Sequence, residues 1–268
     1  MDISTLFSLE GKVAVVTGGS RGIGKHFAQA FIQAGCAKVY ITARKGGELH
    51  ETAEELGERV VPIQGDISTL EGIDELVREI SDREDHLDIL VNNAGAAWGA
   101  DYLDFPEEGW DKVMDLNVKT PFFLTQKLHG LLTAQASQDK PGKVINIASI
   151  DGLRINPWET YSYQASKAAL IHLTRRMAAR LVKDHIYVTG IAPGAFPSNM
   201  NKVARDMADE SAKGIPNKRV GDKFDMGGSA VYLASRAGDY TVGETIAVDG
   251  GIVNAHLPTH FADPAGGR

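Results

Sequence analysis

Short runs of apolar and β-branched residues alternate along this chain with longer amphipathic stretches, and this alternation restricts the fold more than any other feature. The runs predict strands at 12–17, 39–42, 60–64, 87–91, 143–148, 186–191 and 245–248. The stretches predict helices at 22–35, 47–56, 70–81, 110–136 and 161–183. Such alternation is typical of α/β proteins with a parallel sheet. Because the runs are apolar throughout, we expect helices on both faces of the sheet, in three layers.

Composition excludes several classes of protein. The 268 residues carry a net charge of -7, which argues against a nucleic-acid-binding surface. Cys36 is the only cysteine, so no disulfide forms within the chain, and its apolar neighbours indicate a buried thiol. No apolar run is long enough to span a membrane, and the N-terminus lacks the pattern of a signal peptide. We therefore expect one cytoplasmic domain over residues 1–268, with no nucleic-acid or membrane partner and no metal site.

A glycine-rich segment follows the first predicted strand and opens the next helix. Its spacing is G-x-x-x-G-x-G, rather than the common G-x-G-x-x-G. Glycines permit a tight turn and let main-chain amides approach a pyrophosphate at a helix N-terminus. Such a run alone is equally compatible with a simple turn, but its place between strand and helix favours dinucleotide binding. The predicted cofactor contacts are Gly18, Ser20, Arg21, Gly22, Ile23 and Gly24.

The residues after the second strand indicate which dinucleotide is bound. An NAD-binding protein usually has Asp or Glu there, which binds the ribose hydroxyls. This chain has Thr42, Ala43, Arg44 and Lys45 instead. We expect Arg44 and Arg21 to bind a 2′-phosphate from two sides, because guanidinium groups match phosphate geometry. The prediction is NADP(H), and the alternative is that Arg44 and Lys45 are solvated loop charges.

Two further strand ends carry residues that suit the rest of a dinucleotide. Asp66 and Ile67 follow the third strand, where the carboxylate is expected to accept from an adenine amine and the isoleucine to pack on the ring. A helix N-cap is a comparable role for Asp66. Asn93, Ala94 and Gly95 follow the fourth strand. Their small size lets the backbone pass close to a ribose, and asparagine side chains there are expected to lock neighbouring loops.

A candidate proton donor stands at the start of the helix predicted over 161–183. Tyr163 and Lys167 are four residues apart, so they share one helical face, and Ser149 lies just beyond the fifth strand. We expect Lys167 to lower the pKa of the Tyr163 phenol from its free value of about 10, and also to hold the nicotinamide ribose. Ser149 is expected to stabilise charge on a substrate oxygen. Asn117 is expected to anchor a water that passes protons to Lys167. A bare Y-x-x-x-K pair is more often an ordinary helix-surface contact.

In this order, the motifs together resemble the short-chain dehydrogenase/reductase family, over about residues 9–253. The resemblance implies a doubly wound Rossmann fold with a sheet of about seven parallel strands, and a homotetramer or homodimer. It implies a catalytic tetrad of Asn117, Ser149, Tyr163 and Lys167. It also implies that the nicotinamide is lined by Pro193, Gly194, Phe196 and Ser198. Within the family, the runs 93–100 and 192–200 are similar to 3-oxoacyl-[acyl-carrier-protein] reductases, in particular to those of the rhamnolipid pathway.

The substrate side is less sharply indicated. Residues 194–222 interrupt the alternation and are predicted to form a mobile lobe, and the residues from 256 a loose tail. Apolar residues expected to line a pocket, or else to cover the cofactor or fill the core, are Trp98, Leu153, Trp158, Phe196, Met200 and Met207. A basic rim that would suit a carrier protein is formed by Lys202, Arg205, Lys213, Lys218 and Arg219.

These features predict an NADPH-dependent enzyme that reduces a carbonyl to an alcohol, with a 3-oxoacyl thioester, held on a carrier, as the leading small-molecule substrate. One alternative is a dehydrogenase of a sugar, polyol, steroid or cyclic ketone, since the same tetrad serves all of these. Another is a protein that binds NADP(H) without turnover. That protein would be expected to have lost part of the tetrad, and all four positions are present here.

Overall fold

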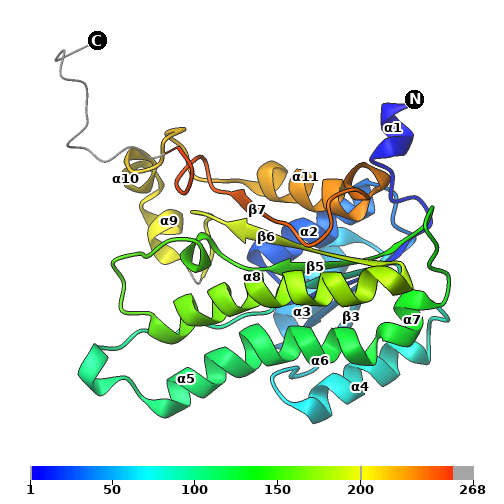
Figure 1. Ribbon diagram of the computed structural model, residues 1–268, viewed down its shortest axis with the longest axis horizontal. Helices are drawn as coiled ribbons and strands as arrows, with labels where there is room; N and C mark the ends of the chain where they lie inside the picture. Colours follow the sequence, from blue (N-terminus) through cyan, green and yellow to red (C-terminus); the bar gives the residue numbers. More distant parts are fainter. Residues whose placement is uncertain (1, 200, 256–268) are drawn as a thin grey trace.

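The computed structural model describes residues 2–199 and 201–255, which form a three-layer α/β structure around a seven-stranded sheet. The strands are β1 (Val13–Thr17), β2 (Lys38–Ala43), β3 (Val60–Gln64), β4 (Ile89–Asn92), β5 (Gly142–Ile147), β6 (Ile186–Pro193) and β7 (Thr245–Val248). All are parallel, in the order β3-β2-β1-β4-β5-β6-β7 (Figure 1). The predicted doubly wound fold is therefore confirmed, with the strand order reversing between β1 and β4.

Helices cover both faces of the sheet. In Figure 1, helices α2 and α11 lie above the strands, and α4, α6 and α8 lie below them. The upper layer also includes α3, and its helices are α2 (Gly22–Gln33), α3 (Gly46–Leu56) and α11 (Lys223–Ala234). The lower layer contains α4 (Leu70–Ser81), α5 (Glu107–Met114), α6 (Thr120–Lys127), α7 (His129–Thr133) and α8 (Tyr161–Leu181). Shorter helices are α1 (Ile3–Leu6), α9 (Lys202–Asp206) and α10 (Ala208–Lys213).

The central strand β1 shows why its sequence is apolar without interruption. Successive side chains of a strand point to opposite faces. Ala14 and Val16 pack into the upper core with Phe27 of α2, whereas Val13 and Val15 pack into the lower core. Each buried methylene contributes about 0.8 kcal/mol, so both faces of this strand stabilise the fold.

The helix predicted over 110–136 is interrupted in the structure. Helix α5 passes through a π-helical turn at Asp115–Lys119 into α6, and α7 follows separately. Pro121 explains part of this break, because it has no N–H to donate to the carbonyl of Asn117, as a regular α-helix would require. Single π-helical turns are frequent at functional sites, and this one contains Asn117.

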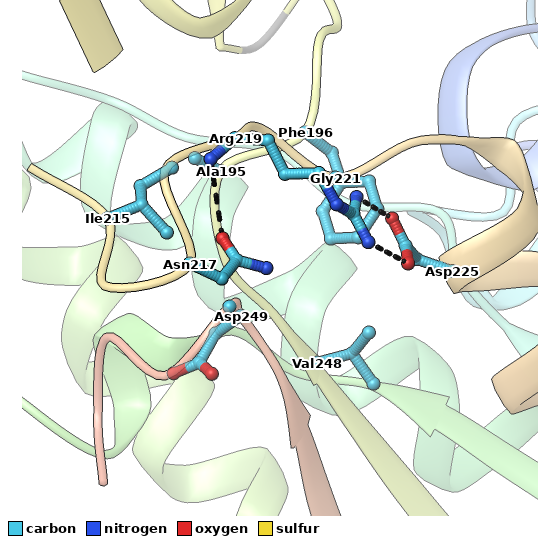
Figure 2. Close-up of a pocket in the computed structure, with 10 residues that line it drawn as sticks. Ala195, Phe196, Ile215, Asn217, Arg219, Gly221, Asp225, Val248 and Asp249 are labelled. Atoms are coloured by element: carbon cyan, nitrogen blue, oxygen red, sulfur yellow. Dashed lines mark hydrogen bonds and ion pairs between the residues drawn. The ribbon is translucent and has the colours of Figure 1, made fainter. Parts of the chain in front are cut away.

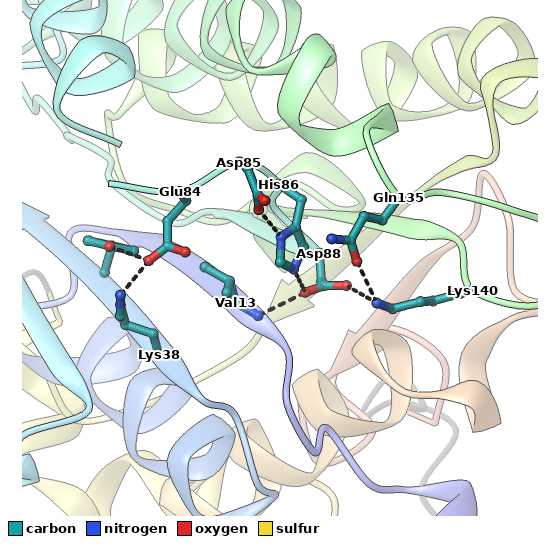
Figure 3. Close-up of polar contacts among 9 residues, drawn as sticks. Val13, Lys38, Glu84, Asp85, His86, Asp88, Gln135 and Lys140 are labelled. Carbon is teal, nitrogen blue, oxygen red and sulfur yellow. Dashed lines mark hydrogen bonds and ion pairs between the residues drawn. The ribbon is translucent and has the colours of Figure 1, made fainter. Parts of the chain in front are cut away.

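The amino-terminal edge of the sheet carries ionic contacts that hold the fold together. Asp88 accepts from the main-chain N–H of Val13 at 2.9 Å, and its carboxylate lies 3.6 Å from Nζ of Lys140 (Figure 3). Glu84 accepts from Nζ of Lys38 at 2.6 Å. These charged groups are satisfied by one another, and they lie at the edge opposite the carboxyl ends of the strands.

The segment 194–222 contains α9 and α10 and is anchored to its surroundings. The N–H of Gly221 donates to the carbonyl of Ala195 at 2.9 Å. Arg219 binds both carboxylate oxygens of Asp225 in the first turn of α11, at 2.5 and 2.7 Å (Figure 2). This pair lowers the pKa of Asp225 to about 2. A partly open cavity beside this pair, lined also by Ala195, Asn217 and Asp249, has a volume of about 50 Å³, which suits ordered water rather than a substrate. The predicted mobility of this lobe stays a prediction.

Two predictions concern residues beyond the described ranges. Met200, expected at the substrate pocket, and the tail from 256 lie outside the residues that the structure describes. None of the helices within 2–199 and 201–255 combines the length and the apolar character that crossing a lipid bilayer requires.

Candidate active site

The carboxyl ends of the central strands bring the predicted site residues to one edge of the sheet. The glycine-rich loop follows β1, Asn93 follows β4, and Ser149 follows β5. Tyr163 lies in the first turn of α8, and Pro193 ends β6. Ligands of doubly wound sheets bind at this edge, beside the point where strand order reverses.

The glycine-rich loop has the shape of a dinucleotide cradle. Gly18 and Gly22 have φ values of 65° and 52°, which favour glycine. A Cβ on Gly18 would lie 3.0 Å from Cα of Ala94, and one on Gly24 would collide with the carbonyl oxygen of Gly18. The N-cap residue of α2 is Arg21, whose side chain makes no capping hydrogen bond. The main-chain N–H groups in the first turn of α2 can therefore donate to a bound anion. These residues therefore fit the pyrophosphate of a dinucleotide.

The turn after β4 is locked to this loop, as predicted for its asparagines. The side-chain amide of Asn93 donates to the carbonyls of Thr17 at 2.8 Å and Gly18 at 3.1 Å. The Thr17 hydroxyl accepts from the N–H groups of Asn93 and Ala94, both at 2.9 Å. The two loops that would flank a cofactor are thus held by direct hydrogen bonds.

The two arginines predicted to bind phosphate lie near this cradle, and one is ion-paired whereas the other is exposed. Nη1 of Arg21 is 2.8 Å from Oε2 of Glu48 in the first turn of α3. Arg44 is exposed, and its carbonyl accepts from the side chain of Gln64 at 3.0 Å. Buried Ser20 accepts through its carbonyl, and the partly buried Ile23 packs against the upper core. Binding of a 2′-phosphate by the two arginines stays a prediction.

The end of β3 differs from the prediction in two respects. The N-cap of α4 is Thr69, not Asp66. The Asp66 carboxylate instead accepts from the N–H and the hydroxyl of Ser68, at 3.0 and 2.8 Å. The Ile67 side chain is only 5% exposed and packs in the lower core. The cap proposed for Asp66 is therefore wrong, and Ile67 has little surface left to pack on an adenine ring.

Three predicted side chains meet beyond β5. Ser149 is buried, and its hydroxyl interacts with Tyr163. Nζ of Lys167 lies 5.6 Å from the centre of the Tyr163 ring and donates to the carbonyl of Ile147 at 2.8 Å. A Cβ on Gly95 would lie 3.7 Å from Nζ of Lys167, so the turn after β4 adjoins the same group.

The electrostatics of this group differ from the prediction. Burial raises the pKa of Tyr163 to about 12, and the hydrogen bond with Ser149 offsets only part of that rise. Burial also lowers the pKa of Lys167 to about 8. The expected lowering of the phenol pKa by the ammonium is therefore wrong for the protein alone, because removal from water dominates the pKa of Tyr163.

Asn117 joins this group through a residue that the sequence did not single out. Its side-chain amide donates to the hydroxyl of Ser166 and to the carbonyl of Ala96, both at 2.9 Å. The hydroxyl of Ser166 donates to the carbonyl of Tyr163 at 2.7 Å. Both amide hydrogens of Asn117 are thus used within the protein. The signal for Ser166 was its position, three residues after the tyrosine on the same helical face.

The end of β6 shows one further departure. The Phe196 side chain is 4% exposed and packs in the upper core, against Gly221, so the core-filling alternative is confirmed and little of the ring is left to line a nicotinamide or a substrate pocket. Pro193 is buried, and a Cβ on Gly194 would lie 2.7 Å from Cα of Asp249. Ser198 faces the glycine loop, with its Cβ 3.7 Å from the position of a Cβ on Gly22.

The residues predicted to form the apolar pocket lining and the basic rim differ among themselves in exposure and in their partners. Trp98 packs on Gly109, whereas Leu153, Trp158 and Met207 are 40%, 64% and 54% exposed. The basic rim is largely neutralised by pairs within the chain, which are Arg205 with Asp206, Lys213 with Glu210 and Arg219 with Asp225. Lys218 donates to a main-chain carbonyl, and the Lys202 side chain lies outside the described parts.

The chain is similar to known oxidoreductases over most of its length. Residues 18–253 match a family model described as enoyl-(acyl carrier protein) reductase. The chain is 43% identical over 250 residues to the rhamnolipids biosynthesis 3-oxoacyl-[acyl-carrier-protein] reductase of Pseudomonas aeruginosa, covering 91% of this chain and 97% of that protein. It is 41% identical over 256 residues to a 2-dehydro-3-deoxy-D-gluconate 5-dehydrogenase of Escherichia coli, covering 93% and 98%.

A solved structure shares the fold. The Pseudomonas aeruginosa RhlG/NADP active-site complex has a TM-score of 0.89 and 41% identity, and covers 93% of this chain and 99% of that chain. The matched region includes the glycine loop, Ser149, Tyr163 and Lys167. On this similarity and the geometry above, the chain belongs to the short-chain dehydrogenase/reductase family of oxidoreductases.

Proposed function

We propose that this chain uses NADPH to reduce a carbonyl group to an alcohol, with Tyr163 as the proton donor. The observation that carries the proposal is the meeting of Ser149, Tyr163 and Lys167 beside the glycine cradle. A bound nicotinamide nucleotide supplies the hydride. With a pKa of about 12, the Tyr163 phenol keeps its proton at neutral pH and has it available for the developing alkoxide. Ser149 donates a hydrogen bond to the same oxygen and stabilises its charge.

Lys167 and Asn117 have supporting roles in this proposal. The Lys167 ammonium, with a pKa of about 8, titrates closer to neutral pH than an ordinary lysine and is suited to return a proton to Tyr163. The side chain of Asn117 already donates both hydrogens within the protein. The main-chain carbonyl of Asn117 lacks an α-helical donor, because residue 121 is proline and has no N–H. This main-chain oxygen is the group we assign to hold a relay water.

The preference for NADPH over NADH rests on charge at the end of β2. Arg44 is exposed there, and no carboxylate occupies the position that usually binds ribose hydroxyls. Arg21, in the glycine loop, is the second basic residue of the predicted phosphate site. The similar RhlG structure is a complex with NADP, which supports the same cofactor here.

A 3-oxoacyl thioester is the substrate we propose. The 43% identical relative is named as a reductase of such a compound. Exposed apolar side chains just beyond Ser149 also favour an alkyl chain, since Ile155 is 88% and Trp158 64% exposed. The second candidate is a sugar-acid dehydrogenase, which is favoured by the 41% identical relative named for 2-dehydro-3-deoxy-D-gluconate.

Initial rates with two cofactors and two substrates test the proposal. NADPH and NADH are each supplied with a 3-oxodecanoyl thioester or with the 5-oxo product of 2-dehydro-3-deoxy-D-gluconate oxidation, and NADP⁺ and NAD⁺ are each supplied with 2-dehydro-3-deoxy-D-gluconate itself. Faster turnover of the thioester with NADPH supports the proposal. Turnover of the sugar acid alone would show that the proposed substrate is wrong. A preference for NADH would show that the proposed cofactor is wrong.

Replacing Trp158 by Ala is expected to raise KM for long acyl chains. The backbone of Trp158 accepts from Gln164 at 3.1 Å and donates to the Asn156 carboxamide at 2.8 Å, so the main chain that carries its exposed ring is tied to the start of α8. Loss of part of its apolar contact predicts a KM about 5- to 20-fold higher for a 3-oxodecanoyl thioester, with acetoacetyl thioester unchanged. Equal effects on both chain lengths in steady-state kinetics would contradict this role.

We also propose that the chain self-associates. Helices α5, α6 and α8 expose a groove lined by Met114, Val118, Phe122, Phe123 and Leu173. Apolar surface of this kind favours association with another protein surface, and a homotetramer or homodimer would cover it. Light scattering of the purified protein is expected to give a mass of two or four chains, and a mass of 28.8 kDa would refute self-association.

A further inference from the structure

We infer that Glu48 competes with the 2′-phosphate of NADPH for Arg21, and so limits how strongly the chain prefers NADPH over NADH. The inference rests on the cofactor proposed above and deepens it. Its starting point is the ion pair between Nη1 of Arg21 and Oε2 of Glu48, at 2.8 Å. Arg21 is the N-cap of α2 in the glycine loop, and Glu48 is in the first turn of α3. A carboxylate thus already occupies one of the two predicted phosphate-binding guanidinium groups.

A buried hydrogen bond between α3 and the glycine loop determines the position of the Glu48 carboxylate. The Thr52 hydroxyl, on α3, donates to the carbonyl of Ser20 in the glycine loop at 2.5 Å. Thr52 is 3% exposed, so this face of α3 is held against the loop. Glu48 is four residues before Thr52 and therefore shares that face, one turn closer to the N-terminus of α3. The ion pair is a consequence of this docking rather than of chance side-chain placement.

The 2′-phosphate and the Glu48 carboxylate are both anions and compete for the Arg21 guanidinium. A phosphate monoester carries between one and two negative charges at neutral pH, and it prefers the same guanidinium edges as a carboxylate. If Arg21 binds the phosphate, Glu48 must either release it or remain close as a like charge. Both outcomes oppose NADPH binding. NADH lacks the 2′-phosphate, so its binding leaves the Arg21–Glu48 pair intact.

Arg44 is independent of this competition. Its guanidinium is exposed and, in the part of the chain described, contacts no carboxylate. We therefore expect some preference for NADPH to come from Arg44 alone, with Arg21 adding to it only when Glu48 gives way. The Arg21 and Glu48 side chains are 51% and 35% exposed, so the pair is hydrated and is broken at modest cost.

Calorimetric titration of NADPH and NADH into the substrate-free protein tests this inference. Glu48→Gln is expected to bind NADPH about 3- to 5-fold more tightly and NADH within 2-fold of the wild type. The matched control is Glu55→Gln, which removes another α3 carboxylate, paired with Lys25 of α2 at 2.5 Å. Glu55 lies two turns further along the helix, roughly 10 Å away, and its loss should leave both affinities unchanged. At 0.5 M salt the gain for NADPH should shrink.

A second variant ties the effect to Arg21. In an Arg21→Met background, Glu48→Gln is expected to change NADPH affinity less than 2-fold, because the shared partner is gone. Unchanged or weaker NADPH binding by Glu48→Gln, or an equal gain for NADH, would overturn the inference while the proposed reductase function stands. A wild type that binds NADH as tightly as NADPH would refute the proposed cofactor preference, whereas the competition is decided by the response of NADPH binding to Glu48→Gln.

Discussion

Tyr163→Phe is expected to lower kcat for carbonyl reduction by about 10²- to 10⁴-fold, with NADPH affinity within 2-fold of the wild type. The substitution removes one hydroxyl and keeps the ring. Because the pKa of Tyr163 is about 12, the group lost at neutral pH is a protonated donor, not a phenolate. Single-turnover kinetics with a 3-oxoacyl thioester, together with NADPH titration, separate chemistry from cofactor binding.

Tyr161→Phe provides a matched control on the same helix. The Tyr161 hydroxyl donates to Glu159 at 3.0 Å, and the ring packs edge-on against Tyr102. Its loss should change kcat less than 3-fold. If Tyr161→Phe abolished turnover and Tyr163→Phe did not, the assignment of the proton donor would be wrong.

Lys167→Met is expected to stabilise the ligand-free protein while reducing kcat by about 10²-fold or more. Lys167 is 5% exposed, and its ammonium donates only to the Ile147 carbonyl among the described contacts. A fall in pKa from 10.5 to about 8 corresponds to about 3 kcal/mol against the charged form. The variant loses that cost and one hydrogen bond, so the free energy of unfolding should rise by about 1–2 kcal/mol.

The same pKa predicts how stability depends on pH. Below pH 8 Lys167 is charged in both states and its burial cost is fully present. Between pH 8 and 10.5 the unfolded chain binds more protons than the folded one, so this residue makes stability increase with pH. Above pH 10.5 the cost is gone.

Denaturant unfolding from pH 7 to 10 measures both parts of this prediction. The gain from Lys167→Met should be largest at pH 7 and should fall towards pH 10. Lys143→Met is the control, because this buried lysine is paired with Asp239 at 2.7 Å and its removal should destabilise. A Lys167→Met protein less stable than the wild type at pH 7 would contradict the account.

Local pattern predicted the sheet and most of the site. Each predicted strand overlaps an observed one, since fully buried strands leave a clear apolar run. The spacing of Tyr163 and Lys167 and the place of Ser149 after β5 were enough to predict that they meet. The break in the helix over 110–136 had a signal in Pro121, which lacks the N–H that a continuous helix needs.

Other features depend on contacts between distant segments. The pKa of Tyr163 is set by how much water the folded protein removes from it, which spacing along one helix does not reveal. Arg21 and Glu48 are 27 residues apart and meet only because α3 docks on the glycine loop. Phe196 follows a loop motif, yet its ring packs in the core against Gly221, and no periodicity marks that direction.

Deuteride transfer tests the central claim most directly. The protein is incubated with NADPH deuterated at the transferable position of the nicotinamide and with either a 3-oxodecanoyl or a 2-decenoyl thioester, and the products are identified by mass spectrometry. The account predicts a 3-hydroxyacyl thioester with one deuterium on the carbinol carbon, formed one-for-one with NADP⁺, and no reduction of the enoyl thioester. Reduction of the carbon–carbon double bond instead, or NADPH binding without transfer to any carbonyl, would contradict it.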